Sequence, residues 1–428
     1  MLRTGHLLRA DRFTFTVRGR PWLNQQWGAQ LVFAWAHRPL GWAGVAATYV
    51  GALAAGFSFL YNACRRAGSA RRTAALLTVA GFLVGAGAMG ARPQALAIPL
   101  FTGTWLLLAR RDRWTWLVPV IAIVWANVHG SFVLAPLLAA LAWLEDVLER
   151  RPARGSALLA LATLLATFVT PFGPTVWSYA WEIARNETIR TTVAEWRPPS
   201  PLSTNGALFW LSGVAVLASG LWSRDRLRPV DVVRLVLFFA LGATSLRSTL
   251  WWALAAPPVV ARWFPTRTDR VTDIDRADRA SLPIAVGAVL LLALIPIGFS
   301  LRAGTDPVTG GPARLGSDAP EVLAGATRRA LPAGSRLLVF QPFASWFEYS
   351  ARRYPVMVDS RIELFPDRVW HDYDRAIVAT DGWQAILDRY RVAGVVLPPG
   401  STLAEALEAD PSWRRVELGE AGSVFVRR

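Results

Sequence analysis

Apolar runs separated by short arginine-rich connections dominate the chain between residues 40 and 301. Most runs have about the 17–22 residues that carry a helix across a lipid bilayer, although several are shorter. The pattern therefore predicts a mostly α, polytopic membrane domain of about ten transmembrane helices, at Leu40–Asn62, Thr73–Ala91, Ala95–Ala109, Trp114–Val128, Ser131–Val147, Ser156–Thr170, Ala207–Ser223, Val230–Leu246, Leu250–Phe264 and Leu282–Leu301.

The two ends of the chain differ from this central region. Residues 1–39 are predicted to form an extramembrane loop followed by a short aromatic helix, Gln26–His37, that lies at the membrane interface or re-enters it. Residues 302–428 have a soluble composition and enough length for one small domain. The predicted domains are therefore 1–39, 40–301 and 302–428.

The C-terminal domain alternates strand and helix patterns, which predicts a small α/β domain of about five strands. It has no glycine-rich phosphate loop, so its sequence contains no sign of a nucleotide site. The predicted strands are Arg336–Phe340, Pro355–Asp359, Ala393–Leu397, Arg414–Leu418 and Ser423–Arg427, and the predicted helices are Trp370–Ala379, Trp383–Tyr390 and Thr402–Glu408.

Charge and composition exclude several classes of protein. The net charge is +16, and all 46 basic residues are arginine. Because the arginines cluster at the ends of predicted spans, their positions indicate membrane orientation rather than nucleic-acid binding. The lone Cys64 excludes an internal disulfide and a cysteine-based zinc site.

Arginines are distributed unequally between alternate connections, which predicts the orientation of the spans. The richer set comprises residues 65–72, 110–113, 150–154, 224–228 and 262–279. Positive residues favour the cytoplasmic side, so we expect this set to face the cytoplasm of a multi-pass inner-membrane protein. The connection at Arg92, the corner at His129, residues 171–206, the N-terminal segment and the C-terminal domain are then outside.

This orientation places a basic N-terminal segment outside the membrane, which is disfavoured unless a preceding span carries it across. Residues 1–20 contain no apolar stretch of the kind found in signal peptides. We therefore expect that the chain begins inside a loop that follows a first transmembrane helix. The alternative is that the first span inserts unaided with its N-terminus outside.

The stretch from Trp125 to Ser131 places two polar side chains, Asn127 and His129, inside an otherwise apolar region. An unsatisfied polar group at membrane depth costs several kcal/mol, and ionisable residues there are candidates for functional sites. The alternative is a helix hairpin that needs a polar, glycine-containing corner where two spans meet.

Acidic residues on the predicted outer side are few, and Asp11 lies in the first outer loop. Its carboxylate is a candidate general base towards a hydroxyl, or a ligand for a divalent metal. The alternative is a loop aspartate that pairs with a neighbouring arginine. The sequence shows no histidine cluster, so it predicts no defined metal site. It also shows no Ser/His/Asp arrangement of the kind used in nucleophilic catalysis.

Several outer basic or amide side chains could grip a phosphate through forked hydrogen bonds. Arg92 and Arg247 lie at outer span ends, against the orientation bias, although they could also be interfacial anchors. Asp359 and Arg361 end a predicted strand, where a salt bridge in a turn is the alternative. The outer basic and amide side chains that could bind a phosphate in this way are Arg92, Gln94, Arg247 and Arg361.

Together the motifs resemble a family of uncharacterised bacterial polytopic proteins grouped with the GT-C fold glycosyltransferases. Relatives of that group include the protein mannosyltransferases and the aminoarabinose lipid A transferases. The matching pieces span nearly the whole chain: Leu2–Gly5, Asp11–Thr16, Gly19–Trp27, Arg92–Gln94, Trp125–Gly130, Pro171–Gly173, Glu195–Trp196 with Pro199, Arg247, and Val358–Arg361.

The resemblance implies a polyprenyl-phosphate sugar donor, used on the outer membrane face, and acidic residues of the first outer loop at the centre of the chemistry. Members of this group usually carry an acidic-aromatic run before the stretch that matches Leu2–Gly5, and here the chain begins instead. Asp11 is then the candidate catalytic residue. The candidate substrate-binding residues are Arg92, Gln94, Asn127, His129, Glu195, Arg247, Asp359 and Arg361.

A second hypothesis is a non-catalytic membrane protein whose outer domain binds a glycan or a protein partner. A transporter is a third, because polytopic proteins often are transporters, but the spans carry few internal charges and show no inverted repeat. The sequence leaves open the sugar, the acceptor, the dependence on a metal and the oligomeric state.

Overall fold

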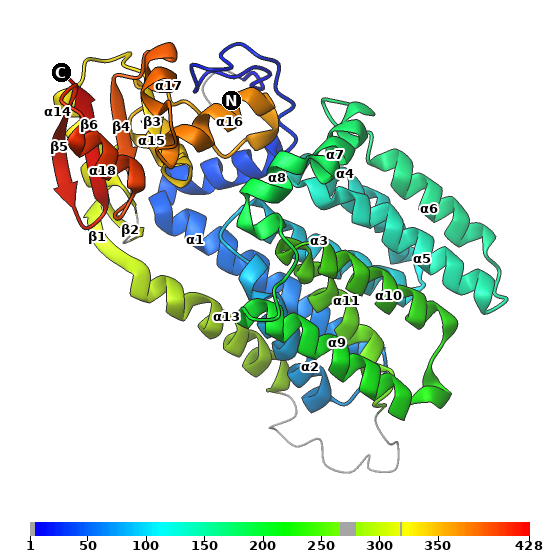
Figure 1. The fold of residues 1–428 in the computed structure, drawn as a ribbon. Coiled ribbons are helices and arrows are strands. Elements are labelled where there is room, and N and C mark those ends of the chain that lie inside the picture. Colours follow the sequence, from blue (N-terminus) through cyan, green and yellow to red (C-terminus); the bar gives the residue numbers. More distant parts are fainter. Residues whose placement is uncertain (1–4, 266–279, 317–318) are drawn as a thin grey trace. The chain divides into compact units, whose positions relative to one another are not determined.

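The computed structural model describes residues 5–265, 280–316 and 319–428 (Figure 1). The chain divides into two compact units. The helical unit comprises residues 25–185 and 190–296, and the α/β unit comprises residues 6–24, 186–189 and 297–428. The predicted connection at residues 266–279 and residues 2–4 of the first matched motif lie outside the described residues.

Each predicted span coincides with a helix of the structure. The helices are α1 (Trp27–Arg66), α2 (Arg71–Gly85), α3 (Pro93–Arg110), α4 (Val118–Val128), α5 (Leu134–Leu148), α6 (Arg154–Ala166), α7 (Thr175–Arg185), α8 (Glu187–Thr192), α9 (Thr204–Trp222), α10 (Pro229–Thr244), α11 (Thr249–Ala261) and α13 (Ser281–Ser300). Short 3₁₀ turns precede or follow several of them: η1 (Ala86–Ala88), η2 (Arg113–Leu117), η3 (Gly130–Val133), η4 (Ala194–Trp196), η5 (Arg224–Arg226) and η6 (Leu246–Ser248).

By length and composition, three helical stretches of the described residues could cross a membrane, fewer than the ten predicted. They are Trp27–Arg66, Gly130–Leu148 and Thr204–Trp222. Several other apolar helices are shorter: α4 has 11 residues, and α6 and α11 have 13 each. The hydrophobic pattern located the helices, but polar corners and 3₁₀ turns shorten many of them below the length of a full span.

The outer surface of the helical unit is apolar along several helices. On α9, the side chains of Leu211, Val214 and Leu217 are each about two-thirds exposed. In contrast, α11 is buried along its whole length. A helix with its leucines outward is the reverse of a helix on a soluble protein, and it suits a surface that faces lipid.

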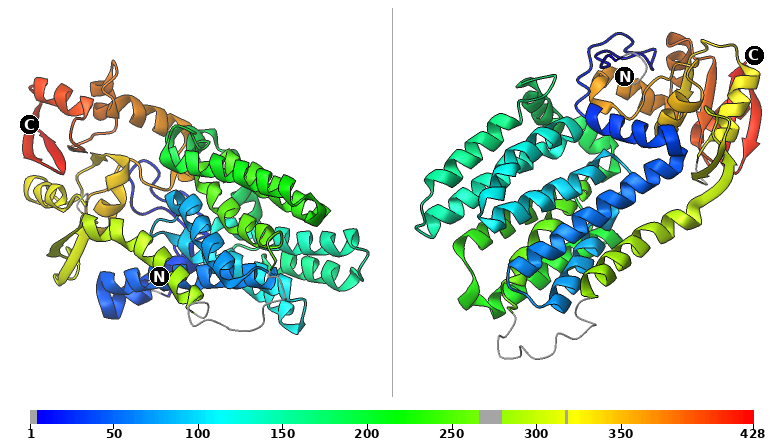
Figure 2. Two further views of the ribbon diagram at one scale, coloured as in Figure 1. Left: turned by 90° about the horizontal axis from the view of Figure 1, so that it is seen from below. Right: turned by 180° about the vertical axis from the view of Figure 1, so that it is seen from behind.

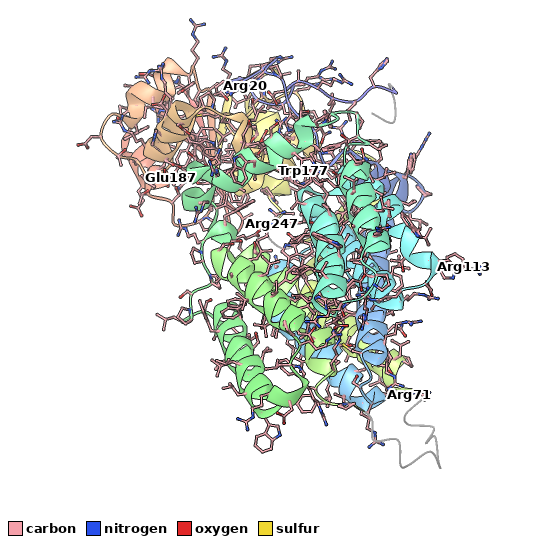
Figure 3. The ribbon with its side chains drawn as sticks, turned by 90° about the vertical axis from the view of Figure 1, so that its right-hand side faces the viewer. Arg20, Arg71, Arg113, Trp177, Glu187 and Arg247 are labelled. Carbon is pink, nitrogen blue, oxygen red and sulfur yellow. The ribbon has the colours of Figure 1, made fainter. Side chains whose placement is uncertain are left out.

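The arginine-rich connections meet at one end of the helical unit. Residues 65–72 form a bridge to the end of α11 through Ser69 and Pro265. Ion pairs join Arg111 to Asp146 and Arg228 to Glu149, and so connect the other arginine-rich corners. Figure 3 shows Arg71 at this end, and Trp177 and Arg247 towards the opposite end. Among the described residues, these contacts bring several of the arginine-rich connections together at one end of the unit.

A sharp bend divides α1 into the two parts that the sequence predicts, a short aromatic helix and a span (right-hand view of Figure 2). Gly41 at the bend has φ 56° and ψ −144°, and Pro39 precedes it. That backbone conformation is accessible essentially only to glycine. The bend therefore depends on the absence of a side chain at this position.

The α/β unit contains a four-stranded sheet and a separate hairpin. The sheet has the order β3-β4-β6-β5, with β3 and β4 parallel and the other pairs antiparallel. The strands are β1 (Leu301–Thr305), β2 (Pro312–Gly316), β3 (Leu337–Val339), β4 (Gly394–Leu397), β5 (Trp413–Gly419) and β6 (Gly422–Arg427), and the helices are α14 (Glu321–Ala330), α15 (Gln341–Ser350), α16 (Asp367–Ile377), α17 (Trp383–Arg389) and α18 (Thr402–Ala409), with the 3₁₀ turn η7 (Ile362–Leu364).

Most elements of the α/β unit were predicted from the sequence. The strands predicted at 336–340, 393–397, 414–418 and 423–427 are β3, β4, β5 and β6, and the three predicted helices are α16, α17 and α18. The segment at 355–359 forms isolated bridges rather than a strand. The hairpin β1-β2 and the helices α14 and α15 were not predicted.

The N-terminal segment, predicted as a separate outer loop, belongs to the α/β unit. Residue Val356 pairs on one side with Leu337 of β3 and on the other with Thr14. The Val356 amide donates to the Phe13 carbonyl at 3.3 Å, and the Phe15 amide donates to the Val356 carbonyl at 3.2 Å. These hydrogen bonds extend the sheet with a segment from the other end of the chain.

We predict that Gly41→Ala destabilises the protein by about 1–3 kcal/mol, because an alanine at this position strains the backbone. Thermal unfolding in detergent micelles measures the effect. Gly51→Ala is the matched control, since Gly51 is helical in α1 and its added Cβ would meet no atom within 4 Å. Equal midpoints for the two variants would contradict the role of Gly41.

Candidate functional site

The predicted site residues fall into two groups, one in each unit. Asp11, Asp359 and Arg361 lie in the α/β unit. The other six lie in the helical unit, at connections between its helices: Arg92, Gln94, Asn127, His129, Glu195 and Arg247. Each group is described within its own unit.

Arg247 lies in η6, the turn between α10 and α11, and a neutral amide holds its side chain. Its Nε donates to Oε1 of Gln94 at 2.7 Å, and Nε2 of Gln94 donates to the Arg247 carbonyl at 3.4 Å. Gln94 is buried in the first turn of α3. The guanidinium also lies 5.7 Å from the ring centroid of Trp196. These contacts fix the direction of the cation without neutralising it.

The nearest carboxylate serves a different cation. Glu195 pairs with Arg92, whose side chain is 56% exposed. Such an exposed ion pair contributes little to stability. Among the described residues, no carboxylate forms an ion pair with Arg247, although the charge of Glu195 is close enough to raise the pKa of its guanidinium. Burial outweighs this effect and lowers that pKa.

Two helix N-termini meet at this corner. Gln94 lies at the start of α3, and Arg247 lies in the turn immediately before α11. Neither helix has an acidic residue in its first turn. The N-terminal end of a helix carries a partial positive charge, so it adds to the charge of the guanidinium. The corner is therefore suited to an anion.

His129 follows the last residue of α4, and its imidazole is 6% exposed. Its Nδ1 contacts Ser131, with 2.8 Å to the hydroxyl and 3.1 Å to the backbone nitrogen. Its Nε2 lies 3.3 Å from Nη2 of Arg247. Burial, and secondly the charge of Arg247, lower the pKa of His129 well below its usual value. The imidazole is therefore neutral at physiological pH.

Asn127 is fully engaged in contacts within the helical unit. Its Nδ2 donates to the carbonyls of Ile123 and Val169, at 2.8 and 2.9 Å, and its Oδ1 accepts from Nε1 of Trp27 at 2.9 Å. These bonds tie the end of α4 to the ends of α1 and α6. Close approach also requires Gly28, where a Cβ would meet the Asn127 carbonyl at 2.7 Å. Asn127 thus has the role of a structural corner, the alternative considered for this stretch.

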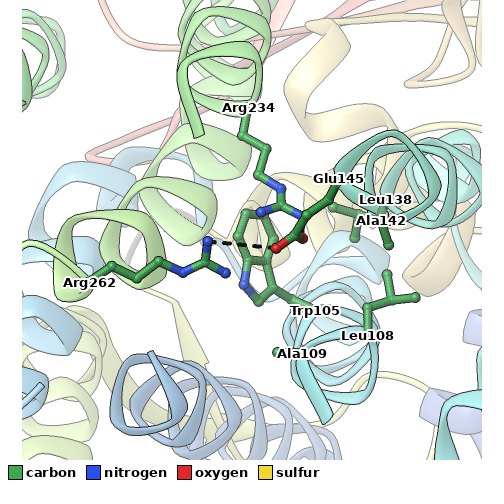
Figure 4. Close-up of a pocket in the computed structure, with 8 residues that line it drawn as sticks. All are labelled: Trp105, Leu108, Ala109, Leu138, Ala142, Glu145, Arg234 and Arg262. Carbon is green, nitrogen blue, oxygen red and sulfur yellow. Dashed lines mark hydrogen bonds and ion pairs between the residues drawn. The ribbon is translucent and has the colours of Figure 1, made fainter. Parts of the chain in front are cut away.

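The opposite end of the helical unit shows how buried arginines are neutralised elsewhere (Figure 4). Arg234 bonds Glu145 at 2.6 Å, and Arg262 bonds Asp231 at 2.9 Å. Glu145 also forms an ion pair with Arg228, at 2.9 Å. A small pocket borders this network, lined by Trp105, Leu108, Ala109, Leu138, Ala142, Glu145, Arg234 and Arg262. In this network, carboxylates neutralise Arg234 and Arg262.

In the α/β unit, Asp11 is 1% exposed and its carboxylate is filled by donors. The amide and hydroxyl of Thr14 donate to Oδ2 at 3.1 and 2.8 Å, and the amide of Phe13 donates to Oδ1 at 3.3 Å. Nη2 of Arg361 donates to Oδ1 at 2.5 Å. This arrangement is the alternative considered for Asp11, a loop aspartate paired with an arginine, and it leaves no free lone pair directed to a substrate.

Arg361 is the centre of a buried cluster of charges. It pairs with Asp359 as well as Asp11, and its guanidinium lies 5.1 and 4.7 Å from the rings of Phe13 and Trp22. Asp359 is completely buried. The neighbouring carboxylates outweigh the burial of Arg361 and raise the pKa of its guanidinium. Arg361 and Asp359 therefore hold the loop around Asp11 in place.

A third carboxyl group, which the sequence did not indicate, joins this cluster. Oε1 of Glu348 on α15 lies 3.8 Å from Nη2 of Arg361. Burial, and secondly the nearby carboxylate of Asp359, raise the pKa of Glu348 to about 9. Glu348 is therefore protonated at neutral pH. In the described residues, no group of three His, Cys, Asp or Glu side chains is arranged to hold a metal ion.

The sequence interpretation also missed Ser131 and Trp125, which contact His129 directly or through one hydrogen bond. Both lie in the stretch that the polar pattern singled out, so the local sequence contained a signal for them. Glu348 had no such signal, because its partners Asp359 and Asp11 reach it only through the fold.

No protein-family model and no curated protein matches this chain. The resemblance to the GT-C glycosyltransferases therefore stays a prediction from the motifs.

We predict that, as pH rises from 5 to 9, the stability of Glu348→Gln falls less than that of the wild type. The pKa of Glu348 is above its unfolded value of 4.5, so the folded protein retains a proton that the unfolded chain has lost. Its contribution to stability is complete below pH 4.5 and declines until pH passes about 9. Thermal midpoints measured between pH 5 and 9 should fall more steeply for the wild type than for the variant.

The control for this prediction is Glu405→Gln, which changes an exposed carboxylate on α18. It should follow the wild-type slope. If Glu348→Gln also follows that slope, Glu348 is ionised in the folded protein.

Proposed function

We propose that the protein is a GT-C-type membrane glycosyltransferase, which transfers a sugar from a polyprenyl-phosphate donor to an acceptor on the outer face of the cytoplasmic membrane. One observation carries the proposal: neutral partners hold the guanidinium of Arg247 beside His129, and no carboxylate of the described residues pairs with it. A guanidinium with free donors suits the two oxygens of a phosphate group.

The apolar surface of the helical unit supports a lipid-linked donor. A polyprenyl chain stays in the bilayer, so its phosphate lies at the interface, at the level of helix ends. Arg247, Gln94 and His129 all lie at or next to helix ends: Gln94 in the first turn of α3, His129 after α4 and Arg247 before α11. In the proposed topology the helices form about ten spans, the arginine-rich end faces the cytoplasm, and the α/β unit is outside.

The chemistry follows from where charge develops. An acceptor oxygen attacks the anomeric carbon of the sugar, and the bond between that carbon and the phosphate oxygen breaks. Polyprenyl phosphate leaves with an added negative charge, which Arg247 is placed to stabilise, because its guanidinium is directed and not neutralised. The acceptor gives its proton to a base, a role that a phosphate oxygen of the departing polyprenyl phosphate can take, because no side chain of this corner is placed for it.

Asp11 was the candidate for that base, and its surroundings favour a second function. With its carboxylate satisfied by Thr14, Phe13 and Arg361, Asp11 has the contacts of a structural residue. This favours a non-catalytic membrane protein whose α/β unit binds a glycan or a protein partner. In that case the cation of the helical unit would hold a lipid phosphate without turnover.

We predict that Arg247→Gln lowers kcat/KM for transfer about 10²- to 10³-fold, the cost of removing a donor that stabilises developing charge. The assay uses full-length protein in liposomes with radiolabelled polyprenyl-phosphate hexoses, and follows release of polyprenyl phosphate. Arg247→Lys keeps the positive charge but loses the two parallel N–H donors of the guanidinium. Its kcat/KM should therefore lie between those of Arg247→Gln and the wild type.

The matched control is Arg113→Gln, which removes an exposed arginine from the turn before α4 and should leave turnover unchanged. Wild-type protein that binds polyprenyl phosphate but releases none from any donor would overturn the transferase and favour the non-catalytic function.

A further inference from the structure

The contacts of Ser131 determine where its hydroxyl proton points. Nε1 of Trp125 lies 3.0 Å from the Ser131 hydroxyl oxygen. An indole nitrogen can only donate a hydrogen bond, so this oxygen is the acceptor. The remaining close partner of the hydroxyl is Nδ1 of His129, at 2.8 Å. The Ser131 hydroxyl can therefore donate its proton to His129 while its oxygen accepts from Trp125, and the backbone of Ser131 decides between this and the reverse.

The backbone of Ser131 decides the direction of this hydrogen bond. Its amide donates to Nδ1 of His129 at 3.1 Å, in the turn that begins η3. A proton on Nδ1 would face this amide proton, and the two would repel each other. Nδ1 must therefore carry a lone pair. A neutral imidazole has one protonated nitrogen, which must then be Nε2. A doubly protonated imidazole meets the same conflict.

The proton on Nε2 faces another donor. Nε2 of His129 lies 3.3 Å from Nη2 of Arg247, and guanidinium nitrogens cannot accept hydrogen bonds. Among the described residues, the acceptor that contacts the Arg247 side chain is Oε1 of Gln94, and it accepts from Nε rather than from Nη2. No acceptor of the described residues therefore lies between Nη2 of Arg247 and Nε2 of His129. Only 6% of the His129 surface is exposed, so bulk water does not surround it. Two donors directed at one place fit an anionic oxygen.

We infer that Trp125 and Ser131 hold His129 as the neutral tautomer with its proton on Nε2, which makes it the second donor, beside Arg247, to a phosphate oxygen of the lipid-linked substrate. This inference rests on the proposed function for the class of ligand. His129 then acts as a hydrogen-bond donor and not as a general base. Ser131 and Trp125 are positioning residues, because they act on the phosphate only through His129.

Two substitutions of His129 separate its donor from its other contacts. The side-chain amide of glutamine can place an N–H near the position of Nε2, whereas the shorter asparagine cannot reach it. In micelles, His129→Asn should weaken the binding of farnesyl phosphate about 10- to 100-fold, the value of a hydrogen bond to a charged group. His129→Gln should retain most of the affinity, and farnesol, which lacks the phosphate, should discriminate between none of these proteins.

Nitrogen NMR of ¹⁵N-histidine-labelled full-length protein tests the tautomer directly. The His129 signals are assigned by their loss in His129→Gln, and their couplings to the ring protons identify which nitrogen carries hydrogen. We expect a bare Nδ1 and a protonated Nε2. Ser131→Ala should shift this pattern and weaken farnesyl phosphate binding, and Ser131→Thr, which keeps the hydroxyl, should restore both.

The outcomes distinguish this inference from the proposed function. A protonated Nδ1, or His129→Asn with wild-type affinity while Arg247→Gln loses binding, would overturn the inference and leave the phosphate site intact. Wild-type protein that binds no farnesyl phosphate would overturn both. Thermal midpoints close to that of the wild type establish that each variant is folded.

Discussion

Neutralisation of buried arginines is the constraint on which the helical unit depends. Removing one partner of a buried ion pair leaves an uncompensated charge and costs about 3–5 kcal/mol, so each buried guanidinium needs a matched acceptor. At the arginine-rich end, Glu145 and Asp231 meet this need for Arg234 and Arg262, and they join α5, α10 and the end of α11. These ion pairs connect the ends of the three helices.

At the opposite end of the same helices, Arg247 departs from that rule. Arg247 follows α10 and precedes α11, yet the acceptor of its side chain is the neutral amide of Gln94, and Nε2 of His129 lies 3.3 Å from Nη2. Neutral partners direct the cation without cancelling its charge. The contrast between the two ends of α10 and α11 is the physical reason for assigning an anionic ligand to Arg247.

The α/β unit shows a different solution for an arginine. Arg361 is enclosed by Asp11, Asp359 and two aromatic rings, and the protonated Glu348 avoids adding a third negative charge beside it. Its hydrogen bond to Asp11 joins residues that are 350 positions apart in the chain. This ion pair, with the strand-like contacts of Val356, holds the N-terminal segment in the unit formed mainly by the C-terminal residues.

By itself, the sequence determined the positions of the long apolar helices of the helical unit and most strands of the α/β unit. Those features depend on local periodicity and on the residues at helix ends, and both are set by residues that are close together in the sequence. It also singled out His129 and Arg247. Only the tertiary structure decided that Asn127 and Asp11 are satisfied by internal contacts, that Glu348 joins Arg361, and that Arg247 meets no carboxylate. The reason is that the state of a buried charge depends on partners tens to hundreds of residues away, which no local pattern encodes.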